Sequence, residues 1–345
     1  MISKRKFAKL AGATALATMM AAGAAMAADV TLRMHQFLPA LANVPKNVLQ
    51  PWADKIMAES GGRIEIQHFP SMQLGGKPPE LIDQAIDGVA DIVWTVAGYT
   101  PGRFPRAEVF ELPFTMTDAG IMSEAYWKLA EETMMDVDFK DFKVLGLWVH
   151  GPGVIHSVDP IVNVSDLNGV KLRAPTRVTN MLMKNLGATP VGMPVPAIPE
   201  ALSKGVVDAT IIPWEVVGAL KVAELVDNHT EFPGKALYTT AFIFAMNKEK
   251  YDSLPDDLKK VIDDNSGLEF SIFAGTQMQA DDAGPRAFAV ENGNNIIQLT
   301  PDQVAEWEAA SASTTEQWIA ETNAAGIDAE GLIARANELL EDAAK

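Results

Sequence analysis

Residues 30–35 read VTLRMH, residues 63–69 read RIEIQHF and residues 91–96 read DIVWTV. The first two runs alternate apolar and polar residues, as half-buried β-strands do, and the third is a short apolar run. Two segments with apolar residues at helical spacing, 45–57 and 78–86, separate the runs and begin at prolines. The order strand, helix, strand, helix, strand predicts parallel strands joined by crossover helices.

The same alternation restarts in the second half of the chain. We predict strands over 144–149, 169–175, 189–193, 206–212 and 238–246, and helices over 176–186, 199–204 and 214–225. A helical stretch over 255–289, broken at most near Gly275 and Gly284, is long enough to cross two lobes. An acidic amphipathic tail, 301–320 and 330–344, follows it. This pattern predicts an α/β fold of two βαβ-rich lobes with a central cleft and a long helix that spans both lobes.

Charge and composition exclude several classes of protein. The 345 residues hold 28 Lys and Arg against 45 Asp and Glu, a net charge of −17. A nucleic-acid binder needs a basic face, and an anionic membrane surface attracts basic segments, so neither is an expected partner. The chain has no cysteine, which excludes disulfides, thiolate chemistry and cysteine-ligated metal centres.

The first 27 residues have the order of a secretory signal peptide. Lys4, Arg5, Lys6 and Lys9 form a basic start, residues 10–25 are mostly apolar, and residues 25–27 read AMA, a cleavage pattern. We expect cleavage near Ala27 and a periplasmic location; both Sec and twin-arginine export stay open, because Lys4 stands where the first of two arginines would be. Residues 1–27 hold four basic and no acidic residues, so the mature charge is −21.

Motifs for catalysis are not found. The chain has no H-E-x-x-H, G-x-S-x-G, Walker or G-x-G-x-x-G motif, and no two of its five histidines stand four residues apart. His150 and His156 flank one turn, which favours structural or cleft-lining roles. A pair of carboxylates acting as acid and base stays an alternative among so many acidic residues.

One basic residue has an unusual setting. Arg173 ends a predicted strand in a segment of small and apolar residues, LRAP at 172–175. A guanidinium stays charged and offers a bidentate fork to a carboxylate, so Arg173 is a candidate clamp for an organic anion, with a surface loop contact as the alternative. Arg177 is expected to face solvent or brace an acid, and Arg103 and Arg106 to anchor a loop.

Several segments, taken in order, resemble the solute receptors of TRAP (tripartite ATP-independent periplasmic) transporters of the dicarboxylate-receptor, DctP-like family. They are FPSMQLGG (69–76) with Glu80, GVADI (88–92), ELPF (111–114), LNGVKLRAP (167–175), LGATP (186–190), EALSKGVVD (200–208) and MNK (246–248). The match extends over about residues 29–320.

The resemblance implies a periplasmic binding protein of the Venus-flytrap type that closes on an organic acid. It also implies delivery to a membrane permease driven by a sodium gradient, a monomeric state, and no catalysis, cofactor or metal. Arg173 falls on the arginine that pairs with the substrate carboxylate in this family.

Other positions depart from the dicarboxylate and sialic-acid branches. Gly153 stands where a second basic residue is often found, Ile212 where a polar residue is found, and Ile211 where some branches use Gln or Glu beside a metal. These departures predict one anion clamp inside an apolar or aromatic pocket. We therefore favour a monocarboxylate ligand with an apolar or hydroxylated body, with an onium zwitterion as an alternative.

Further pocket residues are expected at the ligand-facing ends of strands. Trp94 and Trp214 are the main candidates, although each tryptophan could instead pack in a core. Glu215 could bond a ligand hydroxyl or ammonium, or serve as an acid at a helix start. Weaker candidates are Phe37, Tyr99 and Phe242.

The two predicted βαβ-rich lobes suggest how the chain is divided between them. We predict lobe I over 28–150 plus about 239–278, lobe II over 151–238 plus about 279–322, and a helical tail over 323–345. A periplasmic sensory subunit with the same fold is an alternative function, and a hydrolase or lyase acting on a small organic acid is a weaker one.

Overall fold

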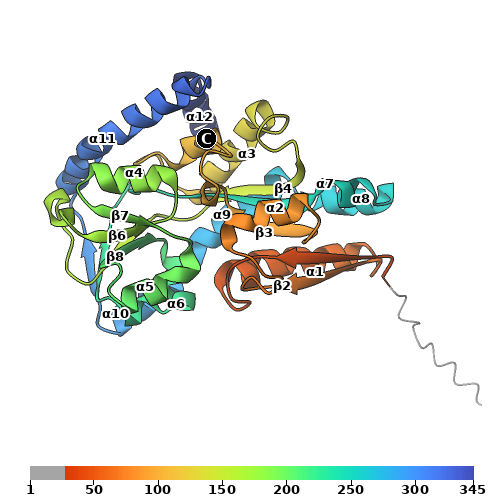
Figure 1. Cartoon of the computed structure of the whole chain (residues 1–345), viewed down its shortest axis with the longest axis horizontal. Coiled ribbons are helices and arrows are strands. Elements are labelled where there is room, and N and C mark those ends of the chain that lie inside the picture. Colours follow the sequence, from red (N-terminus) through yellow and green to blue (C-terminus); the bar gives the residue numbers. More distant parts are fainter. Residues whose placement is uncertain (1–27) are drawn as a thin grey trace, which may run out of the picture.

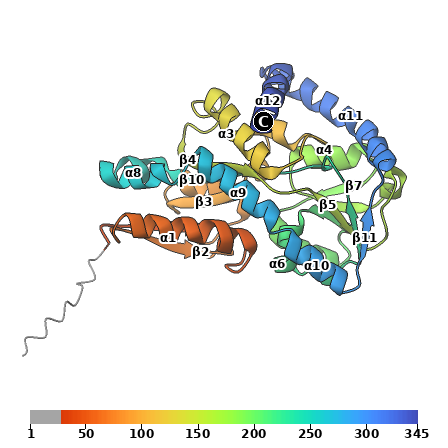
Figure 2. The same ribbon diagram turned by 180° about the vertical axis from the view of Figure 1, so that it is seen from behind.

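The computed structural model describes residues 28–345, so the predicted signal peptide lies outside the described residues. Two sheets with helices packed around them form the fold (Figure 1 and, from behind, Figure 2). The first sheet has the strand order β2-β1-β3-β10-β4, and the second has the order β11-β9-β5-β8-β6-β7. The predicted two-lobed α/β architecture is confirmed.

The first sheet begins as the opening sequence runs predict. Strand β1 (Val30–His35) pairs in parallel with β2 (Ile64–Phe69) and with β3 (Ile92–Val96). Strand β10 (Ala241–Asn247) then inserts antiparallel between β3 and β4 (Phe142–Val149). A late segment of the chain thus returns to the first sheet and ties the two halves of the sequence together.

The second sheet places the segment of Arg173 in its interior. Strand β6 (Lys171–Ala174) pairs in parallel with β7 (Thr189–Gly192) and with β8 (Ala209–Ile212). Three further strands complete the sheet: β5 (Val154–Ser157), β9 (Asn228–Glu231) and β11 (Asn295–Gln298). The sequence patterns did not predict these three strands.

Helices cover both sheets. They are α1 (Gln50–Glu59), α2 (Leu81–Ile86), α3 (Ala119–Thr133), α4 (Arg177–Asn185), α5 (Ile198–Ser203), α6 (Trp214–Leu220), α7 (Lys248–Asp252), α8 (Asp256–Asp264), α9 (Leu268–Ala280), α10 (Ala283–Glu291), α11 (Pro301–Ala324) and α12 (Ala329–Ala343). The acidic tail bridges the lobes, because α11 packs on α4 of the second lobe and α12 packs on α3 of the first (Figure 1).

The prediction of one long helical stretch over 255–289 is wrong. The segment forms α8, α9 and α10, and its breaks lie at 265–267 and 281–282. Gly267, which directly precedes α9, has φ +90°, a conformation outside the helical range, so α8 and α9 do not form one continuous helix. Gly275 is not a break: it lies within α9 against α3, where a Cβ would be 2.6 Å from the Ala119 carbonyl oxygen. The passage between the lobes is therefore made by two helices, α9 and α10 (Figure 2).

The predicted helix over 214–225 is also shorter than expected. Helix α6 ends at Leu220, because Lys221 adopts a left-handed conformation with φ +56°. A single turn of 3₁₀ helix, Val222–Glu224, follows.

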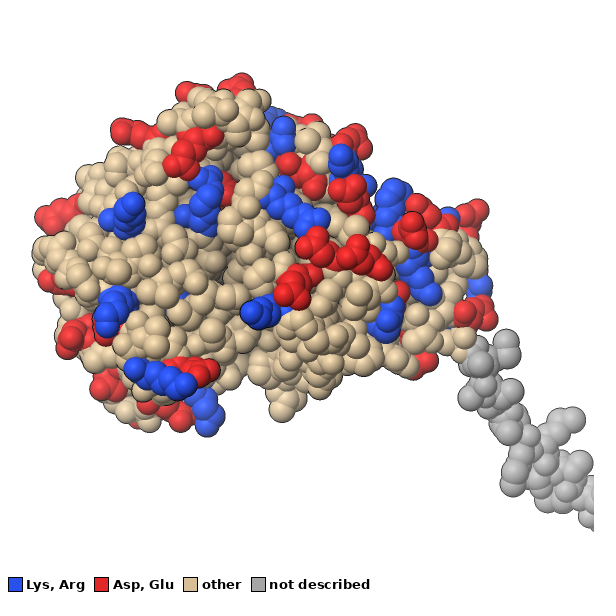
Figure 3. All heavy atoms as spheres, in the orientation of Figure 1, with Lys and Arg blue, Asp and Glu red and all other residues tan. Residues whose placement is uncertain are grey.

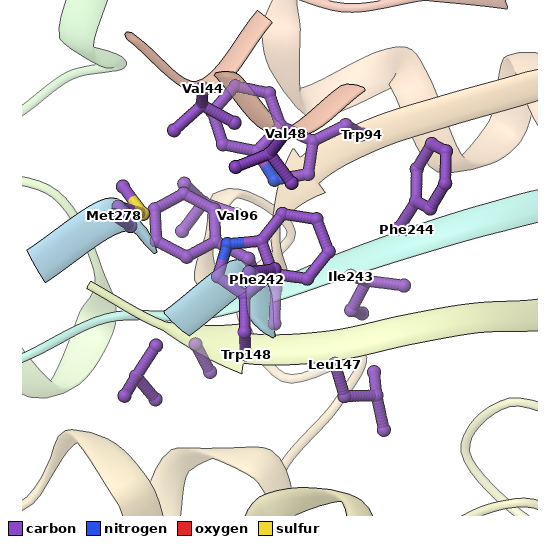
Figure 4. Packing of buried hydrophobic residues seen from close by; sticks show 14 of the residues in the cluster. Val44, Val48, Trp94, Val96, Leu147, Trp148, Phe242, Ile243, Phe244 and Met278 are labelled. Atoms are coloured by element: carbon purple, nitrogen blue, oxygen red, sulfur yellow. The ribbon is translucent and has the colours of Figure 1, made fainter. Parts of the chain in front are cut away.

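A cluster of aromatic residues lies among aliphatic ones in the core beside the first sheet (Figure 4). Trp94 of β3 stacks on Phe242 of β10 with ring centroids 5.2 Å apart, and Trp148 of β4 lies 6.2 Å from Trp94 at an interplanar angle of 6°. Phe244 and Phe270 continue the cluster. These buried rings fix the three adjacent strands relative to one another.

The surface is charged and mixed in sign. Figure 3 shows basic and acidic side chains interspersed over one face, and several form pairs one helical turn apart, such as Lys248 with Asp252 at 2.8 Å. Among residues 28–345, no helix combines the length and the apolar character needed to cross a bilayer.

Candidate functional site

A pocket lies between the two sheets, lined by residues from both and from the segments that join them. Seven of the nine residues singled out from the sequence line it: Phe37, Trp94, Tyr99, Arg173, Ile212, Glu215 and Phe242. The lining residues not singled out from the sequence are Leu38, Val96, Pro175, Val195, Pro213, Val216, Tyr238, Thr240 and Met278. The space not filled by protein atoms, about 380 Å³ including space open to solvent, is an upper limit for a ligand in this conformation.

Arg173 is buried in this pocket without an acidic partner. Its exposed fraction is 1%, and its Nε and Nη1 donate to the carbonyl oxygens of Met193 at 2.9 Å and Ile211 at 3.0 Å. Its Nη2 has no hydrogen-bond partner among the described residues. Burial lowers the pKa of the guanidinium, with Tyr99 and Tyr238 acting in the opposite sense. The side chain is thus held by two carbonyls, and one N–H edge stays unsatisfied.

The other arginines named from the sequence have acidic partners. Arg177 pairs with Glu108 and Glu321, as its expected bracing role requires. Arg103 pairs with Asp83 at 2.5 Å, and Arg106 pairs with Asp138 at 3.0 Å. Arg173 differs from them in being both buried and free of any carboxylate in the described part of the chain.

Trp214 does not line the pocket, contrary to the expectation. Its indole packs edge-on against His156, with centroids 5.0 Å apart, and its Nε1 donates to Glu231 Oε1 at 2.9 Å. It faces a separate crevice that Glu231 and Arg286 also line. Consecutive residues at the start of α6 point in different directions, so the next residue, Glu215, faces the pocket instead.

Gly153 lies behind the pocket wall rather than in it. Its backbone N–H donates to the Tyr238 carbonyl oxygen at 3.1 Å. A Cβ at this position would be 2.1 Å from Tyr238 Cε1, so the tyrosine ring occupies the space that a side chain would need. Tyr238 itself lines the pocket near Arg173.

The aromatic residues form one wall of the pocket. Phe37 stacks on Trp94 with centroids 4.7 Å apart at 18°, and Trp94 in turn stacks on Phe242. Tyr99 packs edge-on against Phe37 at 5.7 Å. This continuous stack joins residues from the loop after β1, from β3 and from β10, and it presents apolar faces and edges to the pocket.

His150 lines the pocket as a neutral ring. Its Nδ1 lies 2.6 Å from the Gly151 carbonyl oxygen, which can only accept, so Nδ1 carries the proton. Its Nε2, 3.0 Å from Thr240 Oγ1, then accepts from that hydroxyl. Burial lowers the pKa of His150 to about 4. Both ring nitrogens are thus used within the protein, which fits the structural, cleft-lining role expected for this residue.

The pKa of His150 has a consequence for stability. Between pH 6.5 and 4 the unfolded chain protonates this histidine while the folded chain does not, so the free energy of unfolding decreases as the pH falls. We expect the wild type to lose up to about 3 kcal/mol relative to His150→Gln over this window, at 1.36 kcal/mol per pKa unit. Urea unfolding of both proteins at several pH values measures the difference. A difference that does not change with pH would contradict the assignment.

Comparison with known proteins finds a matching family and similar solved structures. The family model of bacterial extracellular solute-binding protein, family 7 (DctP) matches residues 35–322. A TRAP solute-binding protein from Rhodoferax ferrireducens, solved with copurified benzoate, is 48% identical with a TM-score of 0.89, and the match covers 91% of this chain and 98% of that one.

Two further relatives extend the comparison. A marine metagenome TRAP solute-binding protein described as specific for aromatic acid ligands, solved with 3-hydroxybenzoate, is 45% identical with a TM-score of 0.90, over 92% of this chain and 100% of that one. The C4-dicarboxylate-binding periplasmic protein DctP of Rhodobacter capsulatus is 24% identical over 311 residues, 89% of this chain and 92% of that protein. The resemblance found in the sequence is confirmed: the chain belongs to family 7 of the bacterial extracellular solute-binding proteins, the DctP family.

Proposed function

We propose that this protein is the solute receptor of a TRAP transporter and that it captures an aromatic monocarboxylate in the pocket around Arg173. The observation that carries the proposal is the buried Arg173 guanidinium, which has one unsatisfied N–H edge and no carboxylate partner in the described chain. A charge taken out of water is costly unless it is paired, and a ligand carboxylate supplies the missing partner.

The number of charges in the pocket favours one carboxylate rather than two. Arg173 is the single Lys or Arg in the lining, and His150 is neutral. A second carboxylate would have no cation to pair with in this buried space. Tyr238 occupies the space that a side chain at Gly153 would need, and the family resemblance implies a second basic residue at this position in other branches, so a dicarboxylate is disfavoured.

The shape and chemistry of the remaining wall favour an aromatic body. Phe37, Trp94 and Phe242 present stacked rings, and Val96, Val216 and Met278 add aliphatic surface. An aromatic ring gains from offset-stacked or edge-on contact with such rings beyond its burial. Benzoate and 3-hydroxybenzoate, the ligands of the two similar structures, fit this description.

The remaining parts of the proposal concern location and partners. We propose that residues 1–27 direct export to the periplasm and are cleaved near Ala27. The two lobes, 28–150 with 239–278 and 151–238 with 279–322, would close on the acid, and the loaded monomer would deliver it to the membrane permease. The protein would act without catalysis, so an acid incubated with it is expected to be recovered unchanged.

A thermal-shift screen tests the ligand class. We expect benzoate and phenylacetate to raise the melting temperature of the purified protein, and succinate and ectoine to leave it unchanged. At 100 times the dissociation constant a ligand adds about 2.7 kcal/mol to the free energy of unfolding, which is an easily measured shift. Repeating the screen after unfolding and refolding removes any copurified acid. A shift with succinate and none with any aromatic acid would overturn the proposal.

A further inference from the structure

The polar groups of the pocket divide into those with partners and those without. The Thr240 hydroxyl bonds His150, and the Tyr99 hydroxyl accepts from the Val195 N–H at 2.9 Å. Three buried lining atoms have no partner among residues 28–345: Arg173 Nη2, Trp94 Nε1 and Glu215 Oε2. Unpaired buried polar atoms are rare in folded proteins, and each calls for a partner. A ligand carboxylate at Arg173 leaves the other two unexplained.

Glu215 is held in the pocket by its backbone, while its carboxyl is free. Its N–H donates to Asp282 Oδ1 at 2.7 Å, and its carbonyl accepts from Asn43 Nδ2 at 2.7 Å. These partners come from the α9–α10 junction and from the segment before α1, so both lobes position this residue. The side chain is 2% exposed and forms no salt bridge with Arg173 or with another basic residue of the described chain.

The position of Glu215 at the start of α6 does not explain its side chain. Asp282, not Glu215, accepts the backbone N–H at this helix end. Glu215 Oε2 bonds no backbone N–H of the helix, and the raised pKa of this buried carboxyl disfavours the negative charge through which an acid stabilises a helix start. The alternative raised from the sequence, an acid that serves only the helix start, is therefore disfavoured.

The charge state of Glu215 selects the group that it can recognise. Burial, together with Asp282 and Asp281, raises its pKa well above the ordinary range of a glutamate. A neutral carboxyl both donates and accepts a hydrogen bond, and its natural complement is a hydroxyl, which does the same. An onium group would instead require the ionised form, whose charge is unfavourable beside two other acids.

We propose that Glu215 determines specificity by hydrogen-bonding a hydroxyl group on the ligand, so that the preferred substrates are hydroxylated aromatic monocarboxylates. This inference rests on the proposed function, because it presupposes an aromatic acid held at Arg173. Glu215 adds selectivity within that class. A pocket built to bond a hydroxyl disfavours the analogue that lacks it, since the buried polar group then stays unpaired.

Calorimetric titration with matched pairs of acids tests this role. The probes are benzoate with its 2-, 3- and 4-hydroxy isomers, and phenylacetate with the corresponding isomers. We expect at least one hydroxylated acid to bind the wild type 10- to 100-fold more tightly than its parent. In Glu215→Leu that advantage is lost: the ratio of the two affinities falls to about one, whatever the affinity for the parent acid becomes. Glu215→Gln, whose amide also donates and accepts, is expected to keep most of the advantage and controls for folding.

The outcomes separate the two proposals. If aromatic acids bind and Arg173→Met removes their binding, but Glu215→Leu weakens parent and hydroxylated acids equally or neither, the role of Glu215 is wrong and the proposed function stands. The same holds if Trp94→Phe, which removes the indole N–H together with the five-membered ring that carries it, erases the advantage while Glu215→Leu keeps it. If no aromatic acid binds the wild type, the proposed function itself fails.

Discussion

Replacing Arg173 with methionine is expected to weaken the binding of benzoate by about 30- to 5,000-fold. Removing one member of a buried, hydrogen-bonded charge pair costs about 2–5 kcal/mol, because the other charge is left buried and unpaired. The ligand carboxylate would be in that position, since the lining holds no other Lys or Arg. Methionine keeps much of the apolar length of arginine, so the change removes the charge without opening a large cavity.

A control variant separates this effect from a general change of charge. Arg103→Met removes a surface arginine that pairs with exposed Asp83 outside the pocket, and we expect benzoate affinity to change by less than about twofold. Arg173→Lys keeps the charge but loses the fork and its bonds to Met193 and Ile211, so its affinity should lie between wild type and Arg173→Met. Isothermal titration of the four proteins gives the comparison. Equal affinity of the wild type and Arg173→Met would show that the acid binds elsewhere.

The sequence was informative where local pattern and topology agree. The runs at 30–35, 63–69 and 91–96 form neighbouring strands because their apolar residues match the period of a strand and their connections contain helices. The small and apolar residues around Arg173 left an anion clamp and a surface contact as alternatives; the family resemblance favoured the clamp, and the structure buries the side chain. Strand patterns of this kind depend on residues that are close in the sequence, so they can be predicted from the sequence.

The remaining details depend on contacts between distant residues. The direction of Glu215 is set by Asp282, which stands 67 residues away, so sequence alone did not place Glu215 ahead of Trp214 in the pocket. The wall formed by Tyr238 depends on its packing against Gly153. Likewise, the break between α9 and α10 occurs where the chain passes from one lobe to the other. Local helix propensity carries no information about this change of lobe.

The packing of Gly153 against Tyr238 predicts that a larger residue at position 153 destabilises the protein. A Cβ on residue 153 would lie 2.1 and 2.3 Å from two Tyr238 ring carbons and 2.7 Å from the Tyr238 carbonyl oxygen. Because the backbone oxygen is also too close, rotation of the ring alone does not relieve the contact. We expect Gly153→Ala to lower the free energy of unfolding by about 1–3 kcal/mol, as overpacking typically does. Benzoate affinity should also fall, since Tyr238 lines the pocket beside Arg173.

Urea unfolding of Gly153→Ala, with Gly284→Ala as the matched control, measures the effect. Gly284 lies in α10 with no atom within 4 Å of its Cβ position, so alanine there is expected to leave the stability unchanged or raise it. The cause can be isolated with a double-mutant cycle, in which Gly153→Ala is introduced into Tyr238→Ala. Without the ring, the substitution should cost clearly less than in the wild type, and only the contact with the carbonyl oxygen should remain. An equal cost in both backgrounds would mean that the ring does not restrict position 153, and the structural reason for having a single basic residue in this pocket would then be wrong.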